Sequence, residues 1–376
     1  MHSESSVKSH LKKNLALLAG ALLVALLLGE VVVRIVDQLT IKSLALPFDH
    51  ERHREDVWLT LHQSFNQPHR PGFEHHPVLG WTPTAGYRKN GVTINAAGIR
   101  SVTETPVQKP EGAVRIGFFG DSFAFGLDVA DEEVFTALLQ ARWPGVEVLN
   151  FAVPGYGTDQ MYLRWRELER QFDLDVAVVL LYLPDIHRDV TPFRDYQKPV
   201  FRFRDDRLTL EGVPVPSEAE VEKRLAARRP KRIFPPWYHL HLYHLVRTRM
   251  RRLLCQIGTY DYDMRVTEGI LEQFQTEVEQ GGGRFALVLA PRQEDAGDAR
   301  GGPYGKIEKR LSRWAEEQGL PLLNLRPALA EASASGGAPL WAGHWTPKGH
   351  RMVARQIAEF LESSGLTQKE VSSSSS

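Results

Sequence analysis

The chain has 376 residues, of which 42% are hydrophobic and 24% charged, so it can bury a full-sized core and carry additional segments. Lys plus Arg and Asp plus Glu both number 46, and a formal net charge of zero excludes a global attraction to nucleic acid. The single cysteine, Cys255, excludes an intramolecular disulfide and a thiolate metal cluster.

An apolar run near the N-terminus predicts where the chain resides. Every residue from 15 to 29 is Leu, Ala, Val or Gly, and the run resumes after Glu30. We expect a transmembrane anchor over residues 15–36, because this length spans a bilayer and no small-x-small cleavage site follows it. Lysines crowd residues 1–14, which favours a cytoplasmic N-terminus and a main domain that is periplasmic or extracellular.

Residues 37–111 lack a helical period and predict a membrane-proximal, strand-rich lead-in. Strands and helices then alternate, which predicts a parallel sheet covered by helices on both faces. The first elements are a strand at Val114–Phe119, a helix at Glu132–Arg142, a strand at Val146–Phe151, a helix at Asp159–Gln171 and a strand at Val176–Leu183.

Residues 190–262, rich in Pro, Arg and aromatic residues, interrupt this alternation as an insertion. Its basic residues between 223 and 252 either contact an anionic polymer or lipid headgroups, or form a solvated helix face. The alternation then resumes, and residues 112–366 form one domain before a low-complexity tail, 367–376, that we expect to be disordered. The later elements are Val266–Glu279 (helix), Phe285–Leu289 (strand), Lys306–Gln318 (helix), Leu322–Leu325 (strand) and His350–Leu361 (helix).

Three loops carry residues suited to catalysis. Ser122 follows Gly120 and Asp121 at the end of the first sheet strand, where open α/β sheets bind ligands, although the same tripeptide suits a turn with a capping serine. Gly155 lies in the loop after the second strand, whose backbone N–H groups can face an oxyanion or simply form a turn. His344 precedes the last helix and can fold back towards Ser122.

The order of these motifs, GDS, NFAVPGYG and HWTPKGH, resembles the GDSL/SGNH hydrolase superfamily over roughly residues 112–364. The preceding LGW and INAAGIR segments look like the lead-in of its bacterial membrane-anchored members. The resemblance implies a flavodoxin-like, three-layer α/β/α sandwich with a central parallel sheet, here preceded by one transmembrane helix. It also implies Ser122 as nucleophile and His344 as base, with the N–H groups of Ser122 and Gly155 as the oxyanion hole.

Two positions depart from the family pattern. Proline, which donates no hydrogen bond, stands at 184, where the family has an oxyanion-binding Asn. The positions that usually carry the aspartate orienting the histidine are Trp341 and Ala342, and Asp185 is a candidate for a supporting role.

These observations leave three functions open. The first is hydrolysis of an acyl ester, such as an acetyl group on a surface glycan, by a serine esterase. The second is O-acyl transfer to an exopolysaccharide, and the third is a catalytically silent glycan- or partner-binding domain. We expect no cofactor, no metal site and no nucleic-acid partner, since the histidines show no ligand spacing with carboxylates.

Overall fold

The computed structural model describes residues 2–39, 71–192, 194, 196–220, 223, 242, 243, 246, 261–298 and 300–368. The chain divides into two compact units, one of Met1–His50 with Arg229–Leu254 and one of Glu51–Arg228 with Cys255–Ser376. Most of the basic stretch 223–252, the lead-in from 40 to 70 and the tail from 369 lie outside the described residues. The expectations for those segments stay predictions.

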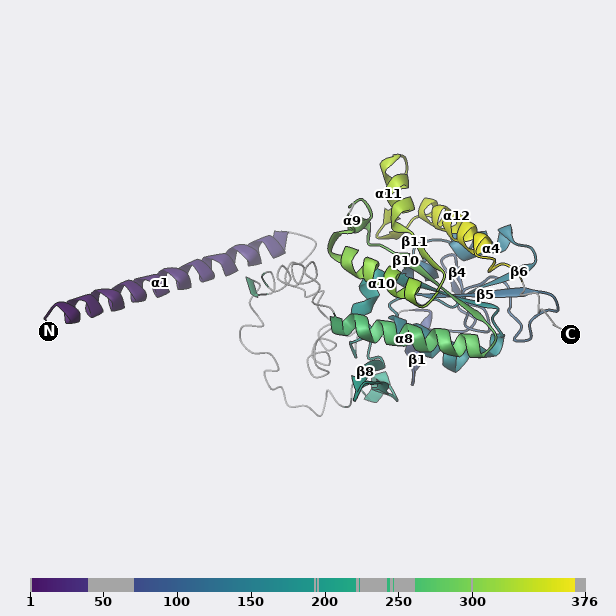
Figure 1. Ribbon diagram of the computed structural model, residues 1–376, viewed down its shortest axis with the longest axis horizontal. Helices are drawn as coiled ribbons and strands as arrows, with labels where there is room; N and C mark the ends of the chain where they lie inside the picture. Colours follow the sequence, from purple (N-terminus) through teal and green to yellow (C-terminus); the bar gives the residue numbers. More distant parts are fainter. Residues whose placement is uncertain are drawn as a thin grey trace. The chain divides into compact units, whose positions relative to one another are not determined.

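Five parallel strands form the central sheet of the larger unit (Figure 1). They are β5 (Val114–Gly120), β6 (Val146–Asn150), β7 (Val176–Tyr182), β10 (Arg284–Ala290) and β11 (Leu322–Asn324). Their order across the sheet is β11-β10-β7-β5-β6, which is the flavodoxin-like order. The point at which the strand order reverses lies between β5 and β7, so ligands are expected at the carboxyl ends of these two strands.

Helices cover both faces of the sheet. They are α4 (Phe135–Arg142), α5 (Thr158–Arg164), α8 (Asp261–Gln280), α10 (Gly305–Glu317), α11 (Arg326–Ala334) and α12 (Pro347–Ser363). Alternate side chains of β7 enter two separate cores, since Val178 and Leu180 pack with α4, α11 and α12, whereas Val179 and Leu181 pack with α5, α8 and α10. Figure 1 shows α8 along one side of the strands and α12 with α4 along the other. The predicted three-layer α/β/α sandwich is confirmed.

The ends of several helices differ from the sequence pattern, and α8 and α12 begin at Asp261 and Pro347, before their predicted starts. Helix α4 starts at Phe135 rather than at residue 132, because Asp131–Glu133 forms a 3-10 turn in which the Glu133 carboxylate accepts from the Ala130 N–H at 3.1 Å. Helix α5 ends at residue 164 and continues as a π-helical turn, Trp165–Glu169. Periodicity does not distinguish these tighter and wider turns from regular α-helix, and it also missed α11.

The lead-in forms two small hairpins beside the sheet. The first joins β1 (Phe73–His76) to β2 (Gly80–Pro83), and the second joins β3 (Arg88–Lys89) to β4 (Val92–Thr93). Two hydrogen bonds connect the first hairpin to the loop after β6: the indole N–H of Trp81 donates to the Pro154 carbonyl at 3.1 Å, and the Tyr156 hydroxyl donates to the Trp81 carbonyl at 2.5 Å. The lead-in therefore packs on the predicted oxyanion loop.

The described part of the insertion contains another antiparallel hairpin, β8 (Val200–Arg204) and β9 (Arg207–Glu211). Phe203 and Leu208 pack from this hairpin onto the core formed with α8, and Gly269 of α8 lies next to both. The β8 and β9 hairpin therefore extends one face of the sandwich.

The smaller unit contains α1 (His2–Leu39), whose segment Lys12–Val33 is long and apolar enough to cross a membrane. A signal sequence has the same properties, so length and composition alone do not fix its topology. Glu30 is the one carboxylate within the segment, and its Oε2 accepts from the Leu242 N–H at 2.8 Å. Its charge is thus partly satisfied by backbone of the same unit.

Candidate active site

Ser122 is placed by a tight turn at the carboxyl end of β5. The short helix α3 (Ser122–Phe125) begins directly after Asp121, whose Oδ1 accepts from the Phe123 N–H at 2.9 Å. Gly120 is required before this turn, because an added Cβ would lie 2.5 Å from the Ala124 Cβ. The turn lies at the β5 and β7 edge, where the strand order reverses, and leaves Ser122 only partly buried.

His344 reaches Ser122 from a distant part of the chain. It lies in β13 (His344–Trp345), which pairs with β12 (Trp341–Ala342) just before α12. The imidazole lies against the Phe123 ring, with 5.1 Å between the ring centroids, and its Nε2 is 3.0 Å from the Ser122 Oγ. Two residues separated by 222 positions are therefore hydrogen-bonded, in the geometry expected of a nucleophile and its base.

Asp128 supplies the carboxylate that the motif near His344 lacks. Its Oδ2 lies 2.8 Å from the His344 Nδ1, and its side chain is 62% exposed. A carboxylate in this place selects the imidazole tautomer that carries a proton on Nδ1 and leaves Nε2 free to accept from serine. The structure thus joins Ser122, His344 and Asp128 in one hydrogen-bonded chain.

Sequence reasoning missed Asp128 because it searched next to the histidine. Trp341 is buried and Ala342 pairs with His344 across the β12 and β13 hairpin, so neither position presents an acid to the ring. The available signal was an acid six residues after Ser122, beyond the left-handed Gly126 that ends α3. A loop that leaves the nucleophile turn and stays at the same sheet edge can bring such an acid to the histidine.

The lead-in holds the loop that carries Asp128. Arg100 is almost fully buried, and its guanidinium donates to the carbonyls of Phe125, Gly126 and Val129 at 2.5–2.7 Å. Its Nε also donates to Asp131 at 3.2 Å. Asp128 itself has a φ of 72°, a strained conformation for a non-glycine residue that the surrounding contacts must hold. Because Arg100 binds carbonyls on both sides of Asp128, the INAAGIR segment is part of the site's framework.

The predicted oxyanion loop lies next to the nucleophile turn. The Val153 N–H donates to the Gly120 carbonyl at 3.0 Å, so the loop runs past the end of β5. Gly155 follows with a φ of 84°, a conformation that favours glycine. The structure brings this loop to the same edge of the sheet as Ser122, and the role of the Gly155 N–H as an oxyanion donor stays a prediction.

Asp185 belongs to a buried ion-pair network instead of contacting His344. Its Oδ1 is 2.7 Å from Arg188, and the same Arg188 nitrogen lies 3.1 Å from the Asp121 Oδ2. The preceding Pro184 lies at the start of a 3-10 turn, where it has no N–H to donate. Asp185 therefore supports the turn before Ser122 through Arg188.

The second histidine of the C-terminal motif is structural. His350 is fully buried, and its Nδ1 accepts from the Phe135 N–H at 3.3 Å. Burial, reinforced by Arg100 and His344, lowers the pKa of His350 to about 3, so the ring is neutral at physiological pH. Within the described ranges, no group of three His, Cys, Asp or Glu side chains could hold a metal ion.

A flavodoxin-like sandwich that brings Ser122, His344 and Asp128 together at the carboxyl edge of its sheet has the arrangement expected of a serine hydrolase. The GDSL-like lipase/acylhydrolase family matches residues 118–352, more than half of the chain, and the protein belongs to this family. It is therefore an enzyme of the class that hydrolyses ester bonds.

Solved structures with a similar fold include a lipolytic protein of the G-D-S-L family from Desulfitobacterium hafniense, with 12% sequence identity and a TM-score of 0.40 over 66% of this chain and 99% of that one. A catalytic mutant of an acetylxylan esterase from Geobacillus stearothermophilus shows 14% identity and a TM-score of 0.40 over 68% of this chain and 96% of that one. No curated protein sequence matches the chain.

Proposed function

We propose that the protein is a serine esterase that removes an acyl group, with an acetyl group on a cell-surface glycan as the favoured substrate. The observation that carries this proposal is the hydrogen-bonded chain from Ser122 Oγ through His344 to Asp128. Membership of an acylhydrolase family supports it independently of the geometry.

The mechanism follows from these contacts. His344 Nε2 accepts the hydroxyl proton as Ser122 Oγ attacks the ester carbonyl, and Asp128 stabilises the imidazolium that forms. The N–H groups of Ser122 and Gly155 would stabilise the negative oxygen of the tetrahedral intermediate. His344 then gives its proton to the departing alcohol, and a water molecule resolves the acyl-enzyme by the same route.

The location of the substrate follows from α1. We propose that the segment Lys12–Val33 is a retained anchor with a cytoplasmic N-terminus, because Lys8, Lys12 and Lys13 cluster at its N-terminal end. The larger unit then faces the periplasm or the cell exterior, where acylated glycans are exposed.

The test is hydrolysis of p-nitrophenyl acetate by the full chain in detergent. We expect Ser122→Ala and His344→Ala to lower kcat by roughly 10⁴- to 10⁶-fold, and Ser335→Ala, at an exposed serine outside the site, to have no effect. A fluorophosphonate should label the wild type and not Ser122→Ala. Activity that survives in Ser122→Ala would contradict the proposal, and acetyl transfer to an added oligosaccharide in preference to water would replace hydrolysis by transfer.

A further inference from the structure

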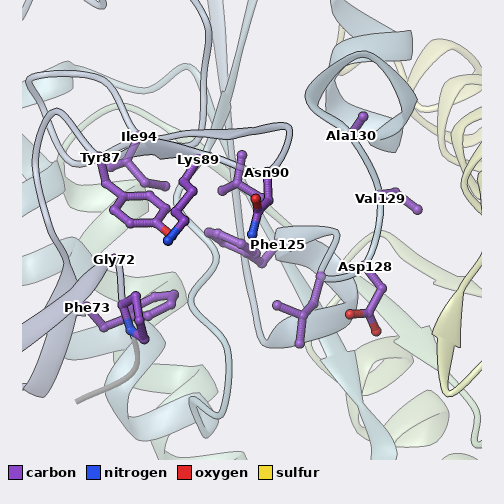
Figure 2. A pocket seen from close by; sticks show the side chains of 13 residues that line it. Gly72, Phe73, Tyr87, Lys89, Asn90, Ile94, Phe125, Asp128, Val129 and Ala130 are labelled. Carbon is purple, nitrogen blue, oxygen red and sulfur yellow. The ribbon is translucent and has the colours of Figure 1, made fainter. Parts of the chain in front are cut away.

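A cavity of about 360 Å³ lies between the lead-in and the loop that carries Asp128 (Figure 2). Phe73, Tyr87, Lys89 and Asn90 line it from the lead-in, and Phe125 and Asp128 line it from α3 and the loop that follows. Its volume is in the range of small-ligand sites. Because Asp128 also hydrogen-bonds to His344, the cavity and the catalytic chain share one residue.

The lining combines aromatic surface with polar groups. The rings of Phe73 and Phe125 lie 6.0 Å apart, and the guanidinium of Arg100 lies 4.8 Å from the Phe125 centroid, which fixes that ring in place. Figure 2 shows the polar ends of Tyr87, Lys89 and Asn90 gathered around the Phe125 ring. Within the part of the chain that the structure describes, these three polar ends have no hydrogen-bond or ion-pair partner.

A rigid turn presents two of these polar groups. Asn90 and Gly91 both have left-handed φ angles, 54° and 75°, as expected for a two-residue hairpin turn of type I′. The turn joins β3 to β4, and the Asp131 N–H donates to the Gly91 carbonyl at 2.9 Å. The backbone that carries Lys89 and Asn90 is therefore fixed relative to the Asp128 loop, which reduces the cost of ordering a site there.

The chemistry of the reaction determines which part of an ester can occupy this cavity. His344 must give its Nε2 proton to the departing alcohol oxygen, so the alcohol lies on the histidine side of Ser122. The carbonyl oxygen points instead to the backbone donors of the oxyanion loop. The cavity borders Asp128, at the opposite edge of the imidazole from Ser122, so only an alcohol long enough to extend past the ring reaches it.

We infer that this cavity binds a carbohydrate unit of the alcohol moiety, adjoining the sugar that carries the acyl group. The inference rests on the ester hydrolysis proposed above. A sugar ring matches the lining because its C–H faces stack on aromatic rings, while its hydroxyls can bond to Tyr87, Lys89 and Asn90. An alkyl chain in the same space would cover those polar groups without giving them partners, which costs free energy.

The test compares two acetyl esters that differ only in the alcohol, partially acetylated xylotetraose and ethyl acetate, using the full chain in detergent. Ethanol is too small to reach the cavity from the acylated serine. We expect Tyr87→Ala and Lys89→Ala each to lower the ratio of kcat/KM for the oligosaccharide to that for ethyl acetate by about tenfold, mainly through KM. Arg88→Ala is the matched control, because Arg88 is exposed on the same strand and does not line the cavity.

The outcomes separate the two proposals. The carbohydrate site is overturned if Tyr87→Ala and Lys89→Ala leave the ratio of the two kcat/KM values at the wild-type level, or if Arg88→Ala lowers it equally. Either result would do so even when ester hydrolysis is intact. Wild-type protein that hydrolyses neither ester in a Ser122-dependent way refutes the esterase itself.

Discussion

Two aspartates flank the nucleophile in opposite environments. Asp121 is fully buried, caps α3 and pairs with Arg188, whereas the side chain of Asp128 is 62% exposed and pairs with His344. The buried acid shapes the turn that presents Ser122, and the exposed acid contacts His344, the proposed base. The buried carboxylate, Asp121, therefore has a structural role, and Asp128, which contacts His344, is the one that we propose for catalysis.

Replacing Asp128 should cause the larger loss of activity. Asp128→Asn keeps the size of the side chain but removes the charge that stabilises the imidazolium, and we expect kcat/KM for p-nitrophenyl acetate to fall about 10²- to 10⁴-fold. The free energy of unfolding should change by less than about 0.5 kcal/mol, because the side chain is exposed. Asp173→Asn is a matched control, since Asp173 is 70% exposed, has a left-handed φ of 50° and lies outside the site.

Replacing Asp121 should have the reverse effect. Asp121→Asn leaves the buried Arg188 with less charge compensation, so we expect the free energy of unfolding to fall by about 1–3 kcal/mol. Denaturant titration monitored by tryptophan fluorescence measures this loss. If Asp121→Asn is as stable as wild type while Asp128→Asn unfolds readily, the assignment of the two acids is wrong.

His350, the buried histidine of the C-terminal motif, should make the free energy of unfolding depend on pH. In the unfolded chain His350 titrates near pH 6.5, but burial lowers its pKa to about 3 in the folded state. Below pH 6.5 His350 binds a proton in the unfolded chain but stays neutral in the folded chain. The unfolded state therefore gains stability as the pH falls, and the contribution of neutral His350 to the free energy of unfolding, complete above pH 6.5, is lost. Between pH 7.5 and 5.5 we expect a loss of about 1.4 kcal/mol from this residue. His350→Asn should remove this component, and an unchanged pH dependence of unfolding in that variant would contradict the account.

The sequence predicted most of the sheet and only two members of the proposed catalytic chain. Each of the five strands is a short apolar run between polar turns, and the alternation of strands with helices determines a parallel arrangement. Ser122 and His344 lie in recognisable motifs, whereas Asp128 meets His344 across 216 residues through a loop held by Arg100. The left-handed backbone at Asp128 and the hydrogen bonds from Arg100 to the surrounding carbonyls arise only in the folded chain. No local sequence pattern predicts them.

The most direct test of the central claim is a double-mutant cycle between Asp128 and His344, measured as kcat/KM for p-nitrophenyl acetate. If Asp128 acts through His344, Asp128→Asn lowers the rate about 10²- to 10⁴-fold in the wild type and leaves the residual rate of His344→Ala unchanged. An equal fold-loss in both backgrounds would show that Asp128 acts independently of His344 and would contradict the proposed catalytic chain.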